Sequence, residues 1–252
     1  MSLLVMVTFD FLSCSKDDKD DNDSTQNKEI ILSTKTIDLK CGNTSSIDIS
    51  GVNGTDCDII VDDEFVVFVS ASKNKINITA KKVGETQITL KYEGEEKIIS
   101  VYVSPSTNYI GKIYIDFNAT KQEIIEHEGI EAENVKDSYL YKFDSQTRFW
   151  SQYYYRLRNN KLDYAFIKAS VKKANNDYYV LTEHLKEFGD FDEIFYASKF
   201  GGNIYLYKRS NDYYIGLREI GVSDDQGWWI VFAKSKDQLK DLLNTDSHIY
   251  SL

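Results

Sequence analysis

Seven short runs in which apolar and polar residues alternate fill residues 29–103. Successive residues of a β-strand point to opposite faces, so each run places its apolar side chains on one side of an extended segment. The apolar members of the seven runs are Ile37/Leu39, Ile47/Ile49, Ile59/Val61, Val67/Val69, Ile76/Ile78/Ala80, Ile88/Leu90/Tyr92 and Ile99/Val101/Val103. Seven half-buried strands within so short a segment predict an all-β sandwich, in which two sheets bury their apolar faces against each other.

Short motifs made of strands and structural glycines recur along the same segment. They are Leu39-Lys-Cys-Gly42, Ile47-Asp-Ile49, Val67-Phe-Val69, Ile76-Asn-Ile-Thr-Ala80, Val83-Gly84 ahead of Gln87-Ile-Thr-Leu90, and Ile98-Ile-Ser-Val-Tyr-Val103. Together these motifs resemble a bacterial immunoglobulin-like (Ig-like) domain of group 2. The resemblance implies a sandwich fold and a role as a spacer or adhesion module rather than as an enzyme.

The only proline, Pro105, directly follows the last of these runs and marks a domain boundary. Sixteen of the 18 tyrosines and all three tryptophans lie beyond it. We therefore expect two domains: the Ig-like sandwich over residues 29–104, and a Tyr- and Trp-rich domain over residues 105–252.

Helical and strand patterns alternate in the second domain. Thr120 and Glu123 form a capping-box pattern ahead of an apolar stretch that ends at Gly129, which predicts a helix over residues 120–129. Further helices are predicted over residues 179–188, which Gly189 follows, and over residues 236–243. The strand patterns cover residues 139–143, 149–157, 162–169, 193–197, 203–208, 213–220 and 227–233.

The two halves of this domain repeat one order of elements. Each of the first two helices precedes a tyrosine-rich hairpin, which turns at Asn159-Asn160 in one half and at Asn211-Asp212 in the other. The repetition predicts an α+β domain with an antiparallel sheet and favours a tandem helix-plus-sheet repeat. The layout resembles that of β-lactamase inhibitor protein and the single unit of the small lipoprotein in the outer-membrane barrel-assembly machinery.

The N-terminus carries a localisation pattern. An apolar run over residues 3–12, too short to span a membrane, ends at Ser13-Cys14, and acidic and other polar residues follow over residues 15–28. Ser13-Cys14 resembles a bacterial lipoprotein processing site, and the acidic stretch resembles the export signal of surface-exposed Bacteroidetes lipoproteins. The resemblance implies a signal peptide over residues 1–14, a lipidated Cys14, a disordered tether over residues 15–28 and an anchor in the outer membrane. The alternative is a cytoplasmic protein with a ragged N-terminus.

The other two cysteines form a candidate pair. If Cys14 is acylated, Cys41 and Cys57 remain, and an oxidising compartment would let them form a disulfide. The alternative is that both remain free, buried thiols.

Charge and motif content argue against several functions. The net charge of -10 is spread along the chain without a basic stripe, so nucleic acid is not expected as a partner. His127 and His184 lie beside glutamates on predicted helices, but neither helix has a second histidine one turn away, so we expect both on solvated faces. No nucleophile elbow, phosphate-binding glycine loop or Cys-x-x-Cys is present. We expect no catalytic residue, metal or cofactor.

Doubled aromatic residues within strands suggest a binding surface. Neighbouring strand residues point to opposite faces, so each doublet places one ring on the core side and one on the outside. The parity of each strand predicts an outer aromatic face made of Trp150, Tyr154, Arg156, Tyr205, Tyr207, Arg209, Tyr214, Arg218 and Trp229. Aromatic and arginine side chains are typical of protein and glycan binding sites. The alternative is that another part of the chain covers this face.

These patterns together favour a non-catalytic cell-surface lipoprotein that binds or adheres to a glycan or a protein through its C-terminal domain. The first alternative is an envelope accessory or inhibitor protein that docks another protein, and the second is a hydrolase of unknown substrate.

Overall fold

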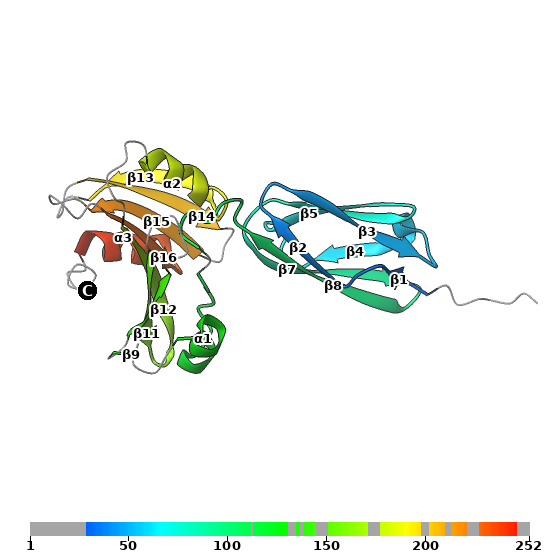
Figure 1. The fold of residues 1–252 in the computed structure, drawn as a ribbon, viewed down its shortest axis with the longest axis horizontal. Coiled ribbons are helices and arrows are strands. Elements are labelled where there is room, and N and C mark those ends of the chain that lie inside the picture. The colour runs from blue at the N-terminus through cyan, green and yellow to red at the C-terminus, as the bar shows by residue number, and fades with distance from the viewer. Residues whose placement is uncertain are drawn as a thin grey trace, which may run out of the picture.

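The computed structural model describes residues 29–111, 113–130, 135–136, 139–144, 151–170, 177–197, 202–209, 213–220 and 227–245. Within these ranges the protein is mostly β, with three sheets and three short α-helices. The chain forms two units that lie end to end, an N-terminal sandwich and a C-terminal sheet with its helices (Figure 1). No helix in these ranges is long and apolar enough to cross a membrane.

The N-terminal unit is a sandwich of two four-stranded sheets, as the alternating pattern predicts. Its strands are β1 (Ile31–Leu32), β2 (Thr36–Lys40), β3 (Thr44–Ser50), β4 (Asp58–Val61), β5 (Val67–Ser72), β6 (Lys75–Ala80), β7 (Gly84–Tyr92) and β8 (Glu95–Ser104), with a 3-10 turn, η1 (Gly54–Asp56). One sheet has the order β1-β3-β6-β5 and the other β2-β8-β7-β4. The seven predicted strands are β2 to β8, and their apolar side chains form one core that joins the two sheets.

Both remaining cysteines are free, so the predicted disulfide is wrong. Cys41 lies at the end of β6 that carries Ala80, because the next residue, Gly42, donates its N–H to the carbonyl of Ala80. Cys57 follows η1, which is bonded to Lys73 ahead of the opposite end of β6. A strand of this length separates its two ends by roughly 16 Å at about 3.3 Å per residue. A disulfide requires Cα atoms within about 7 Å of each other.

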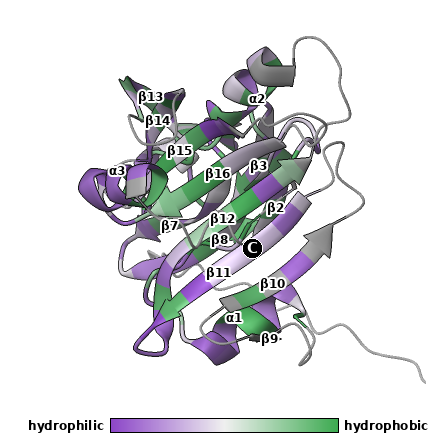
Figure 2. Ribbon diagram, turned by 90° about the vertical axis from the view of Figure 1, so that its left-hand side faces the viewer, coloured by the Kyte–Doolittle hydropathy of each residue, from purple (hydrophilic) through white to green (hydrophobic). Residues whose placement is uncertain are grey.

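The C-terminal unit is built on one antiparallel eight-stranded sheet with the order β13-β14-β15-β16-β12-β11-β10-β9 (Figure 2). Its elements are α1 (Lys121–Glu128), β9 (Val135–Lys136), β10 (Tyr139–Asp144), β11 (Ser151–Arg158), β12 (Lys161–Ser170), α2 (Asp177–Leu185), β13 (Asp190–Tyr196), β14 (Asn203–Arg209), β15 (Tyr213–Ile220), β16 (Gly227–Ala233) and α3 (Lys236–Thr245). Each half runs from one helix into four consecutive strands. The last strands of the two halves, β12 and β16, pair at the centre of the sheet.

Local sequence signals fix the predicted helix and hairpin of the first half. The side chain of Thr120 accepts from the N–H of Glu123, whose carboxylate accepts from the Thr120 N–H, and Gly129 ends α1 in the left-handed conformation. Asn159 and Asn160 have φ values of 53° and 60°, as a tight two-residue hairpin turn requires.

Apolar layers cover both faces of the eight-stranded sheet. Helices α1 and α2 and residues 109–111 and 113–119 pack on one face, which we call the α1/α2 face. Helix α3 packs on the opposite face, the α3 face, through Leu239 and Leu243. Strand β15 has Gly216 under this helix, where a larger side chain would overlap Leu243. The central strands are therefore buried on both sides.

Candidate functional site

The residues predicted to form one outer aromatic face lie on two faces of the sheet. In β14, Tyr205 and Tyr207 lie opposite Leu217 and Ile215 of β15, which places them on the α1/α2 face. Arg209 follows the same alternation. The remaining described members, Tyr154, Arg156, Tyr214, Arg218 and Trp229, lie on the α3 face. The alternation within each strand was predicted correctly, but the alignment of one strand with the next was not.

Most of these side chains are buried, so the prediction of an exposed aromatic face is wrong. Buried members are Tyr154, Tyr207, Arg209, Arg218 and Trp229, while Arg156, Tyr205 and Tyr214 are half-buried, and Trp150 lies outside the described residues. The covering layer on the α3 face is α3 itself, whose Leu243 carbonyl accepts a hydrogen bond of 2.9 Å from the Arg218 guanidinium. The structure agrees with the alternative prediction, in which another part of the chain covers this face.

The sandwich meets the C-terminal unit at the turn between β6 and β7. The Val83 N–H donates to the carbonyl of Glu187, just beyond α2, over 2.7 Å. The Lys82 ammonium donates to the carbonyl of Lys186 and pairs with the carboxylate of Asp190, both at 2.7 Å. The Val83 side chain is buried within the apolar layer of the α1/α2 face. These contacts fasten one end of the sandwich to the end of α2.

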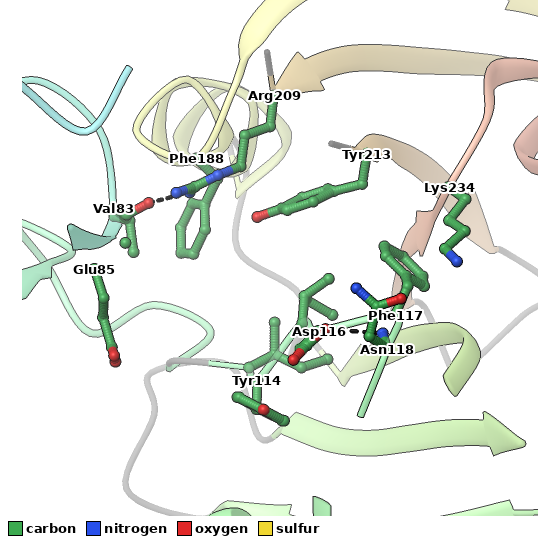
Figure 3. Close-up of a pocket in the computed structure, with 13 residues that line it drawn as sticks. Val83, Glu85, Tyr114, Asp116, Phe117, Asn118, Phe188, Arg209, Tyr213 and Lys234 are labelled. Carbon is green, nitrogen blue, oxygen red and sulfur yellow. Dashed lines mark hydrogen bonds between the residues drawn. The ribbon is translucent and has the colours of Figure 1, made fainter. Parts of the chain in front are cut away.

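Arg209, at the end of β14, adds contacts from the C-terminal unit to the sandwich. Its guanidinium donates to the carbonyl of Val83 (Figure 3). The same guanidinium lies 3.6 Å from the carboxylate of Asp63. A Cβ atom on Gly84 would overlap this guanidinium, so only glycine admits the arginine here. The Gly84 φ of 153° is also one that side-chain-bearing residues rarely adopt.

A cavity of about 410 Å³ opens at the junction, and we take it as the candidate functional site. Its wall combines Val83, Gly84 and Glu85 of the sandwich, residues 113–118 ahead of α1, and Phe188, Arg209, Tyr213 and Lys234 of the C-terminal unit. Figure 3 shows Arg209 reaching Val83, with Glu85 on the sandwich side and Asp116 and Tyr114 on the side of the C-terminal unit. Neither unit alone could form this cavity.

Aromatic rings make up much of the cavity wall. Phe117 and Tyr213 meet edge to face, with centroids 6.2 Å apart. The Tyr114 ring stacks on the ring of His127 with centroids 4.1 Å apart, which fixes its orientation. Phe188, just beyond α2, supplies a fourth ring. Rings held by such contacts offer rigid apolar surfaces to a ligand.

Charged and polar groups stand between these rings. Glu85 and Asp116 bring carboxylates, and Lys234 brings an ammonium that lies 5.8 Å from the centroid of Phe117. Burial raises the pKa of the Tyr114 phenol, and the nearby carboxylates of Asp116 and Glu123 raise it further. The phenol therefore stays protonated and can donate a hydrogen bond.

His184 supports the junction from behind the cavity, and the expectation that it lies on a solvated helix face is wrong. Its side chain is 2% exposed and packs edge to face against the rings of Tyr109 and Phe188. Its Nδ1 atom lies 3.5 Å from the hydroxyl of Thr107. Burial lowers the pKa of the imidazole to about 4, although Glu187 opposes the shift. The segment that follows Pro105 covers this histidine, which the helix pattern alone could not indicate.

The described residues of the cavity wall do not bring metal ligands together. Across the described ranges, no three His, Cys, Asp or Glu side chains are grouped so that they could hold a metal ion. The lining instead provides ring faces, carboxylate acceptors and ammonium and phenol donors. That combination suits a neutral ligand with many hydroxyl groups or one with mixed charges.

Comparisons with known proteins leave the family open. No protein-family model and no curated protein matches the chain. Among solved structures, domains 5-6 of the S-layer protein SbsC are 12% identical, with 82% of this chain and 85% of that chain covered and a TM-score of 0.27. Domains 4-9 of the same protein are 13% identical, with 82% and 27% covered and a TM-score of 0.28. A longer SbsC structure is 11% identical, with 82% and 22% covered and a TM-score of 0.28. TM-scores this low carry no argument about this chain.

The junction cavity could not be predicted from the sequence. Its lining comes from segments far apart in the chain, and Arg209 and Val83 are 126 residues apart. The only local signal is Gly84, which the sequence pattern explains equally well as a structural glycine of the sandwich.

Proposed function

We propose that the protein is a lipid-anchored binding protein of the cell surface that holds a sugar unit of a glycan in the junction cavity. The observation that carries this proposal is the cavity of about 410 Å³, lined by four aromatic rings, two carboxylates and an exposed lysine. Small-molecule sites commonly have volumes of about 300–1,000 Å³ and often lie between domains. The anchor and the surface location rest on the resemblance of Ser13-Cys14 and the following acidic stretch to a surface lipoprotein signal.

The chemistry of the lining favours a sugar over other small ligands. A sugar ring presents C–H groups on its faces and hydroxyl groups around its rim. The half-buried ring of Tyr114 can cover the C–H groups. The carboxylates of Glu85 and Asp116 can accept hydrogen bonds from hydroxyl groups, and Lys234 can donate to them.

Binding of the Cys14→Ala full chain to an array of immobilised glycans tests the proposal, followed by titration with the glycan that binds. Glu85→Gln is the informative variant, because Glu85 is exposed in the cavity wall and its replacement leaves the core intact. A hydrogen bond to a charged group contributes about 1.5–3 kcal/mol, so the Kd should rise at least about tenfold.

Glu96→Gln is the matched control, since Glu96 is exposed on β8 outside the cavity wall, and it should leave the Kd unchanged. Absence of any bound glycan, or equal Kd values for the two variants, would reject the proposal. Fractionation of cells that express the protein tests the anchor. The Cys14→Ala variant should appear in the soluble fraction, whereas the unchanged chain should remain with the membranes.

A further inference from the structure

Strand β13 forms one edge of the eight-stranded sheet. It pairs with β14 on its inner side, and no strand in the described part of the chain pairs with its outer side (Figures 1 and 2). The N–H and C=O groups along such an edge are a template for another strand.

The edge strand also exposes large apolar side chains. Phe191, Ile194 and Tyr196 are 50%, 51% and 65% exposed. They lie opposite Tyr207, Tyr205 and Asn203 of β14, so all three lie on the α1/α2 face of the sheet. A folded monomer gains little from apolar groups left in water, whereas a strand added at this edge would cover them.

The charges that commonly protect an edge strand are neutralised in β13. Asp190 pairs with Lys82 at 2.7 Å, and Asp192 pairs with Lys236 at 2.7 Å. Glu193 pairs with Lys236 and also with Lys240. Every carboxylate of the strand thus has a lysine partner from another element. A second strand of the same sequence would meet no net charge of its own sign.

A bulge in β13 limits the part of the strand that can pair with another strand. The register with β14 shifts between Phe191 and Glu193, where the strand carries a bulge. Bulges bend and twist an edge strand and so interrupt regular pairing. The regular part of the edge therefore begins at Glu193 and includes the apolar residues Ile194, Phe195 and Tyr196.

We propose that β13 is a self-association strand that pairs antiparallel with β13 of a second copy of this chain about a two-fold axis. The axis passes Phe195, which faces Phe195 of the partner subunit. Ile194 then lies opposite Tyr196 of the partner subunit, and Glu193 lies opposite Ala197 of the partner subunit. This register joins apolar side chains across the axis and sets no two carboxylates opposite each other. The two eight-stranded sheets become one continuous sheet.

Sedimentation velocity of the Cys14→Ala full chain over a series of concentrations tests the proposal. The expected result is a concentration-dependent dimer whose dissociation constant rises at least tenfold in the Ile194→Lys variant. Ile194 is half exposed, so the variant should fold, which circular dichroism can check. Phe68→Lys is the matched control, because Phe68 is 60% exposed on β5 of the sandwich, and it should leave the dimer unchanged.

Cross-linking tests the register. Ile194→Cys and Tyr196→Cys chains should form an intermolecular disulfide when mixed under oxidation, and neither variant should do so alone. A monomer at every concentration, or a dimer that Ile194→Lys leaves intact, overturns the proposal. A dimer that Ile194→Lys disrupts but that forms no mixed disulfide overturns the register. Neither result depends on glycan binding, so failure here leaves the proposed function standing.

Discussion

Burial keeps the imidazole of His184 neutral in the folded protein, with a pKa of about 4 against 6.5 for a free histidine. The unfolded chain binds a proton below pH 6.5 that the folded chain does not bind until about pH 4. The contribution of neutral His184 to the free energy of unfolding is therefore fully present above pH 6.5 and is lost as the pH falls toward 4. The free energy of unfolding should drop by about 2 kcal/mol between pH 7 and pH 5. Urea unfolding at several pH values measures this drop.

The His184→Gln variant should lose most of that pH dependence, whatever its stability at pH 7. The carboxylates of Glu95, Glu123 and Glu193, whose pKa values are lowered by hydrogen bonds, change protonation below the usual carboxylate pKa of 4.5 and so act outside this window. His127→Gln is the control, since the His127 side chain is 42% exposed, and it should keep the drop. An unchanged slope in His184→Gln would show that the imidazole titrates freely in the folded state.

Strand β16 is buried on both of its faces. Trp228 is 6% exposed on the α1/α2 face, and Trp229 is 3% exposed on the α3 face, stacked on Phe166 at 5.6 Å. Truncating either ring opens a large cavity, so Trp228→Ala and Trp229→Ala should each lower the free energy of unfolding by about 3–5 kcal/mol. Denaturant titration of both variants tests this expectation.

Tyr179→Ala serves as the control for the tryptophan pair, because this ring is 66% exposed on α2. Its replacement should change stability by no more than about 0.5 kcal/mol. If Trp229→Ala behaves like this control while Trp228→Ala is severely destabilised, α3 does not cover the sheet and the α3 face is open.

The elements themselves follow from local sequence, whereas their faces do not. The capping box at Thr120, the glycine that ends α1 and the Asn159-Asn160 turn act within a few residues, so the helix and the hairpin were predicted with nearly correct bounds. The alternation within each strand is also local. Alternate side chains of β14 share a face of the sheet with particular side chains of β15, and this depends on how the two strands pair. Whether α3 covers that face depends on packing after the helix and the sheet have formed. The prediction of an exposed aromatic face was wrong because it depended on this pairing and packing.

The two units of the molecule are joined by a small set of contacts around one turn. Val83, Lys82 and Ser106 bond to the end of α2, and Arg209 closes the junction from β14. The cavity exists only while this arrangement holds, because both units contribute to its wall. Sequence patterns describe each unit separately, so they could predict the two units but not the site between them.

Gly84→Ala tests whether Arg209 holds the two units in this arrangement. The added Cβ would overlap the guanidinium, so Arg209 must leave the Val83 carbonyl and Asp63. The units should then move more freely about residues 104–107. Small-angle scattering should detect a broader distribution of distances, and limited proteolysis should cut these residues faster.

Gly94→Ala is the control that separates backbone strain from the loss of the junction. Gly94 also has a positive φ, 88°, but a Cβ there would meet no atom within 4 Å. Both variants should therefore lose stability through strain, on the order of 1–3 kcal/mol. Only Gly84→Ala should change the scattering and the cleavage, because only there is a contact between the units displaced. A Gly84→Ala protein that scatters like the Gly94→Ala protein would show that Lys82, Val83 and Ser106 hold the junction without Arg209.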